Sequence, residues 1–65
     1  MTRDEVYAIF NKADSGDVNA MKKAASILIE MSEQHTNAGR IEQALSCIEK
    51  SDYYAKKIRA VDPKW

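Results

Sequence analysis

Hydrophobic residues recur along this chain at the spacing of α-helices, in three stretches separated by short polar segments. The first stretch repeats Val6, Ile9, Phe10 and Ala13 and predicts a helix over about residues 3–13. The second stretch predicts a helix over about residues 18–36, and the third predicts a helix over about residues 40–60. The pattern therefore predicts one all-α domain, residues 1–65, in which a short N-terminal helix packs on a long antiparallel helical hairpin.

The residues between these stretches are those that start and stop helices. Thr2 followed by Glu5 is typical of a capping box, and Asp17 is placed to cap the second helix. Gly39 supplies the left-handed residue that ends the second helix, and Pro63 prevents the third from continuing. The boundaries of all three helices therefore have a local chemical cause.

Both long helices are apolar over more than one face. The apolar arc of the second helix, centred on Leu28, spans roughly 200°, whereas an ordinary surface helix shows a stripe of about 100° or more. In the third helix, two rows with heptad spacing predict close packing against the second: Ile41, Ile48 and Ala55 in one, and Ala44, Ser51 and Ile58 in the other. One neighbouring helix does not cover so much apolar surface.

Chain length leads to the same expectation. A chain of 65 residues has a marginal core and usually needs a disulfide, a metal or other subunits. The one cysteine, Cys47, has no intramolecular partner, and the one histidine, His35, makes no ordinary zinc site. We therefore expect a homo-oligomer, with Ile27, Ile29, Met31 and Tyr54 at the interface.

Charge and hydropathy exclude several partners. Ten basic and ten acidic residues give a formal net charge of zero, which argues against binding to duplex nucleic acid. No apolar run reaches the ~18 residues of a membrane span, and the N-terminus lacks the layout of a signal peptide. We expect a cytoplasmic protein without a membrane partner.

No combination of residues indicates catalysis. His35 and Cys47 fall in different predicted helices, both on or beside apolar faces, where a structural role explains them. Asp14 and Asp17 lie in a turn, where capping explains them without a metal ion. We therefore predict a binding protein with no catalytic residues, metal ligands or cofactor.

Three clusters remain open to either a binding or a structural interpretation. Lys22 and Lys23 head the polar side of the second helix, where a solvated face is the simpler explanation. The second cluster, late in the third helix, is explained by the helix dipole, which favours cations there; it contains Lys56, Lys57 and Arg59. The third cluster, near the C-terminus, is explained by burial of aromatic rings between subunits; it contains Tyr53, Tyr54 and Trp65.

The third predicted helix also resembles part of a known family. The sequence Arg40-x-Glu42-x-Ala44-Leu45-x-x-Ile48-Glu49-x-x-x-x-Tyr54-Ala55-x-Lys57 resembles the second hairpin helix of phage anti-defence proteins. That family sequesters the cyclic nucleotide messengers of the bacterial CBASS and Thoeris immune systems. The chain departs from the family pattern at Ile41, which separates Arg40 from Glu42, and at Tyr54, which stands in place of tryptophan. The match covers about a third of the chain.

This resemblance implies a non-catalytic sponge that binds a cyclic di- or trinucleotide in pockets between subunits. It places Tyr7 as the aromatic that stacks on a base and Lys22 or Lys23 as the cation for phosphate. A neighbouring subunit is expected to add Arg3 or Arg40. Stacking of this kind contributes about 1–3 kcal/mol per base, and a lysine ammonium serves phosphate as a point charge.

A second resemblance favours a different function. Ala13-x-x-Gly16-Asp17-x-x-Ala20 and Gly39-x-x-x-x-Ala44-Leu45 resemble segments of tetratricopeptide and Sel1-like repeats. The resemblance implies a helical adaptor for protein–protein interaction. The chain is long enough for at most one and a half repeats, whereas such solenoids need about three to bury a core. A dimerising or DNA-associated regulator is the third alternative, which the neutral charge disfavours.

Overall fold

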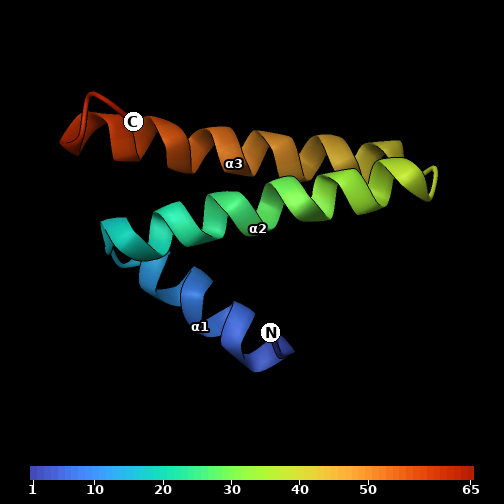
Figure 1. Ribbon diagram of the computed structural model, residues 1–65, viewed down its shortest axis with the longest axis horizontal. Coiled ribbons are helices and arrows are strands. Elements are labelled where there is room, and N and C mark those ends of the chain that lie inside the picture. Colours follow the sequence, from blue (N-terminus) through green and yellow to red (C-terminus); the bar gives the residue numbers. More distant parts are fainter.

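The computed structural model describes residues 1–65 and contains three α-helices and no strand (Figure 1). They are α1 (Arg3–Asp14), α2 (Val18–Asn37) and α3 (Ile41–Val61). The all-helical class expected from the sequence is confirmed. Each helix begins and ends within one residue of the position that the hydrophobic pattern and the capping residues predict.

The helix ends are formed by the side chains that the sequence singles out. The Glu5 amide donates to Thr2 Oγ1 at 3.2 Å, and the Ala20 amide donates to Asp17 Oδ1 at 3.0 Å. Gly39 follows α2 with φ of +78°, a left-handed conformation in which a side chain would be strained. The α1–α2 turn and the tight α2–α3 turn are therefore both set by local chemistry.

Replacing Asp17 by alanine tests how much the α2 cap contributes. The substitution leaves the Ala20 amide without its side-chain acceptor and removes a negative charge from the positive end of α2. We expect the free energy of unfolding to fall by about 0.5–2 kcal/mol, measured by urea denaturation followed by circular dichroism. Asp4→Ala, an exposed change in the first turn of α1, is the control, and an equal loss in both variants would contradict the assignment.

The middle helix, α2, carries the core because both other helices pack against it (Figure 1). Its buried residues include Met21 and Leu28 together with Ala24 and Ala25, as the apolar arc centred on Leu28 predicts. From α1, Ala13 is buried, and Ile9 and Phe10 pack against this core. The breadth of the α2 arc therefore has a cause within the chain, because α1 and α3 cover most of it from two sides and leave Ile29 half exposed.

The seam between α2 and α3 uses a different set of residues from the one expected. The buried residues of α3 follow a regular heptad spacing: Ala44, Cys47, Ser51, Tyr54 and Ile58. The row of Ala44, Ser51 and Ile58 was predicted, but Ile41 and Ile48 of the other row were wrongly assigned to the seam, whereas Ala55 of that row is partly buried. Ile41 and Ile48 are 54% and 50% exposed, because Cys47 and Tyr54 take the second row of the contact.

Two polar side chains of α3 tie the three helices together. Ser51 Oγ donates to the Ala25 carbonyl of α2 at 3.3 Å, and Tyr54 Oη donates to Asp14 Oδ1 of α1 at 2.6 Å. Tyr54 was expected at a subunit interface, yet its side chain is 1% exposed within a single chain. That expectation is corrected: Tyr54 is buried by its own chain, where burial and the hydrogen bond to Asp14 raise the pKa of its phenol.

None of the three helices is both long and apolar enough to cross a membrane.

Candidate functional site

The five residues expected to bind a ligand lie on three parts of the chain: α1, α2 and the turn before α3. Arg3 and Tyr7 lie together on α1, where the Arg3 guanidinium carbon is 5.7 Å from the centre of the Tyr7 ring. Tyr7 is about half exposed, so one arginine and one aromatic face stand side by side at the surface. The pair has the chemistry to stack on a base and to meet an anion.

Lys22 and Lys23 form the second group, on the polar side of α2. They line an open hollow together with Met1, Ser26, Ile27 and Glu30. Lys22 Nζ lies 3.5 Å from Asp62 Oδ2, and both side chains are partly exposed, so this ion pair contributes little and leaves the lysine able to change partner. The hollow has a volume of about 380 Å³, at the small end of the ~300–1,000 Å³ of ligand pockets.

Arg40 is remote from the two lysines. It precedes α3 at the opposite end of α2 from the α1–α2 turn, roughly 20 Å along the helix axis from Lys22 at about 1.5 Å per residue. Its Nε donates to His35 Nδ1 at 2.9 Å. One chain therefore cannot bring Arg40 and Lys22 to the same small ligand.

The four residues expected at an oligomer interface differ in how much of their surface is exposed. Ile29 is half exposed on α2, Ile27 is partly buried and lines the lysine hollow, and Met31 is partly buried against the core. Ile29 is thus the one of the four with a large free surface. Tyr54 is fully enclosed by its own chain, as described above.

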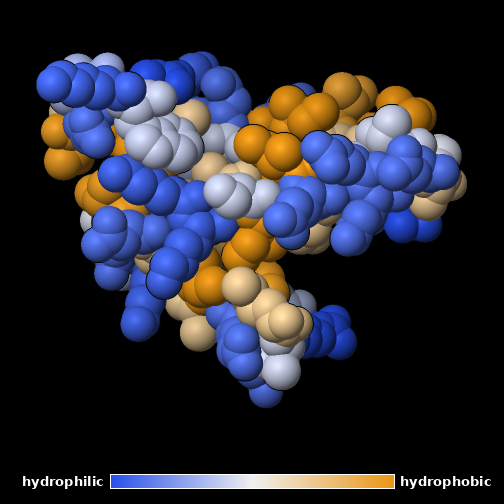
Figure 2. Space-filling view, viewed as in Figure 1, coloured by the Kyte–Doolittle hydropathy of each residue, from blue (hydrophilic) through white to orange (hydrophobic).

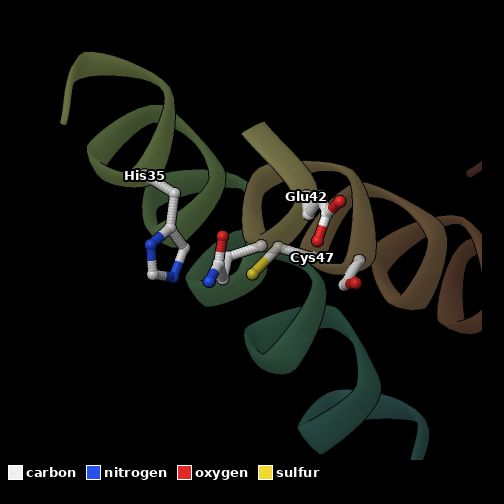
Figure 3. A pocket seen from close by; sticks show the side chains of 5 residues that line it. His35, Glu42 and Cys47 are labelled. Atoms are coloured by element: carbon white, nitrogen blue, oxygen red, sulfur yellow. The ribbon is translucent and has the colours of Figure 1, made fainter. Parts of the chain in front are cut away.

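A second hollow brings together two residues that the sequence places in different helices. His35 of α2 and Cys47 of α3 line it with Glu42, Gln43 and Ser46 (Figure 3). Because His35 Nδ1 accepts from Arg40, a neutral His35 ring carries its proton on Nε2. Cys47 is nearly buried, and no three histidine, cysteine or acidic side chains lie close enough to hold a metal ion.

The structure also groups two sets of exposed residues that the sequence reasoning missed. The first, which we call the apolar stripe, consists of Ile41, Leu45 and Ile48 on α3, each about half exposed. Figure 2 shows hydrophobic atoms gathered over this N-terminal half of α3. Their spacing of four and three residues was the signal, because it marks one side of a helix.

The second set, which we call the basic face, consists of Lys50, Tyr53, Lys57 and Val61 on α3. Lys50 Nζ and Lys57 Nζ each lie 4.8 Å from the centre of the Tyr53 ring. The spacing of three, four and four residues places all four side chains on one side of the helix. The sequence singled out Tyr53 and Lys57 but assigned them to different clusters, and it overlooked Lys50.

Neither protein-family models, nor curated proteins, nor solved structures give a significant match to this chain. Any assignment of function therefore depends on the surfaces described above and on the resemblances carried by the chain's own residues.

Proposed function

We propose that this protein is a non-catalytic binding protein that holds a cyclic nucleotide in pockets between the subunits of a homo-oligomer. One observation carries the proposal. The chain exposes an arginine–tyrosine pair on α1 and a two-lysine hollow on α2, and Met1, two residues before Arg3, also lines that hollow. Tyr7 and one of the two lysines are the residues that the resemblance to phage sequestering proteins assigns to the base and the phosphate.

The chemistry of the two groups suits a ligand with bases and phosphates. An exposed tyrosine face accepts any base by stacking, at about 1–3 kcal/mol, without hydrogen bonds that select one base. Lys22 and Lys23 supply two ammonium groups on one side of α2, and either binds phosphate as a point charge. A ligand that carries both features gains from both groups at once.

The size of the hollow favours a site between subunits. At about 380 Å³ and open to solvent, it does not enclose a molecule of two or three nucleotides. A second subunit placed over it closes the site and supplies Arg3 and Tyr7, or Arg40, from another chain. We therefore expect ligand affinity to depend on the assembled protein.

Isothermal titration calorimetry with a panel of cyclic di- and trinucleotides tests the proposal. We expect binding to the intact protein, weakened about tenfold or more by Tyr7→Ala and by Lys22→Ala, because each removes one of the two interactions. Tyr7→Phe is the matched control for the ring and should keep the affinity, since stacking needs only the aromatic face. Lys56→Ala is the matched control for charge, because Lys56 is an exposed lysine of α3 paired with Asp52.

Two outcomes count against different parts of this proposal. If the intact protein binds no cyclic nucleotide at 100-micromolar ligand, a concentration well above about micromolar affinity, the function is wrong. If binding is present but Tyr7→Ala and Lys22→Ala leave it unchanged, the function stands and the site is wrong. Circular dichroism and oligomer size must match the wild type in each variant for either conclusion.

A helical adaptor that binds another protein is the second candidate. The observation that favours it is the apolar stripe, because exposed hydrophobic residues in a contiguous row mark interaction surfaces. An adaptor would keep this stripe free for the apolar side of a partner helix and would bind no cyclic nucleotide. The oligomeric state of the purified protein separates the two candidates, because only the first needs other copies of the chain.

A further inference from the structure

Helix α3 has two exposed surfaces of opposite character on the sides that α2 leaves uncovered. The apolar stripe occupies its N-terminal half, and the basic face extends over its C-terminal half. Figure 2 shows the first as hydrophobic, whereas hydrophilic and intermediate residues dominate the second half of the helix in that view. The formal net charge of zero thus conceals an uneven distribution of charge along one helix.

The surroundings of the apolar stripe are acidic. Glu42 lies three residues before Leu45 and Glu49 lies four residues after it, so both carboxylates flank the stripe along its outer edge. Both side chains are exposed, and neither takes part in an ion pair. A surface that covers the stripe therefore gains if it carries cations beside its apolar groups.

The basic face has this composition. Val61 is 69% exposed and Tyr53 is nearly half exposed, which provides apolar and aromatic area. Lys50 and Lys57 stand on either side of Tyr53 in the sequence, and their ammonium groups lie against its ring. The two surfaces are complementary in charge. The basic face carries two lysines beside Tyr53, and the apolar stripe has two carboxylates beside its aliphatic side chains.

We propose that the basic face of one copy of this chain packs on the apolar stripe of another, with Lys50 and Lys57 opposite Glu42 and Glu49. This inference rests on the homo-oligomer of the proposed function and names its contact surfaces. At 100° per residue, the centres of the two surfaces lie roughly 160° apart around the axis of α3. One neighbour does not reach both, so the contact is head-to-tail and each chain contacts two others in a ring or a filament.

A mixing experiment tests this arrangement in the absence of any nucleotide. Leu45→Asp disables the stripe and leaves the basic face intact, whereas Lys57→Glu combined with Val61→Asp disables the basic face and leaves the stripe intact. Both variants alter exposed residues, so both should keep the helical content of the wild type. Sedimentation velocity and native mass spectrometry give the oligomeric state, and Ala8→Asp, an exposed change on α1, is the matched control.

The expected results are specific to head-to-tail contact. The wild type and Ala8→Asp form oligomers larger than a dimer, and each disabled variant associates at least ~100-fold more weakly, because a charge replaces apolar contact in the interface. An equimolar mixture of the two variants forms a one-to-one dimer, since the intact basic face of one fits the intact stripe of the other. Higher salt weakens that dimer, because two pairs of charges meet across it.

Several results would overturn the proposal. A wild type that stays a ~7.4 kDa monomer at all concentrations would contradict the proposal. So would a mixture that remains monomeric although each variant alone has lost association, because the intact basic face of one variant then fails to bind the intact stripe of the other. Nucleotide binding is measured separately, so an oligomer that binds none refutes the proposed function and leaves the contact surfaces standing.

Discussion

Replacing Ile58 by alanine is expected to lower the free energy of unfolding by about 2–5 kcal/mol, the largest loss of any single side chain considered for this protein. Ile58 is 0% exposed and is one of the two largest fully buried side chains. The core around it contains several alanines, whose single methyl groups cannot reorient to fill the resulting space. A chain of this length has a total stability of roughly 3–10 kcal/mol, so the variant should be partly unfolded at room temperature.

Urea denaturation of Ile58→Ala measures this loss, and Ile29→Ala provides the comparison. Ile29 is the same residue type in another helix but is half exposed, so its truncation should cost well under half as much. Both variants are compared at a protein concentration where the wild type is a single species. Equal losses in the two variants would mean that the packing of α3 on α2 is not as described.

The locations of the helices could be predicted from the sequence because their causes are local. The Thr2 and Asp17 caps and the left-handed Gly39 act within three or four residues of themselves, so their effects can be recognised in the sequence. The ion pair between Asp52 and Lys56, at 3.2 Å, is equally local, because a spacing of four residues places both side chains on one side of α3. Each of these features appears in the structure where the sequence places it.

The choice of the seam on α3 could not be predicted in the same way. The row of Ile41 and Ile48 is as apolar as the row of Cys47 and Tyr54, so hydrophobicity alone does not decide which of them faces α2. In the structure the buried row is the one whose Tyr54 also donates a hydrogen bond to Asp14, 40 positions earlier in the chain. A helical wheel contains no such long-range contact, and the error left the apolar stripe unrecognised.

The same distinction between local and long-range contacts applies to the candidate site. The Arg3–Tyr7 pair is local, four residues apart on α1, and its proximity follows from the helical spacing. The Lys22–Asp62 and Arg40–His35 contacts depend on how helices and turns are placed in space, and the sequence named none of them. The path of α1 across α2 has the widest consequence, because it covers part of the apolar surface that we expect other subunits to bury, whereas Ile29 stays half exposed.

Replacing Tyr54 by phenylalanine is the second large effect that we expect, and it depends on pH. Near pH 7 the variant loses the hydrogen bond from the phenol to Asp14, which should cost about 1.5–3 kcal/mol because the acceptor is a carboxylate. The ring itself remains, so the packing of α3 against the core is preserved. Tyr53→Phe is the matched control, because Tyr53 is exposed and makes no such hydrogen bond, and it should change stability by a few tenths of a kcal/mol.

The pH dependence separates the hydrogen bond from a packing effect. Burial, together with the adjacent Asp14 carboxylate, raises the pKa of Tyr54 in the folded chain above the value of about 10 that a phenol has when unfolded. Above pH 10 the unfolded chain therefore holds fewer protons at this site than the folded chain, and stability at this site falls as pH rises. The advantage of the wild type over Tyr54→Phe should be constant between about pH 7 and 9 and should shrink above pH 10, by up to about 1.4 kcal/mol per pH unit. Urea denaturation of both proteins at each pH measures it, and a difference that stays constant through pH 11 would show that Tyr54 does not hold its proton against Asp14.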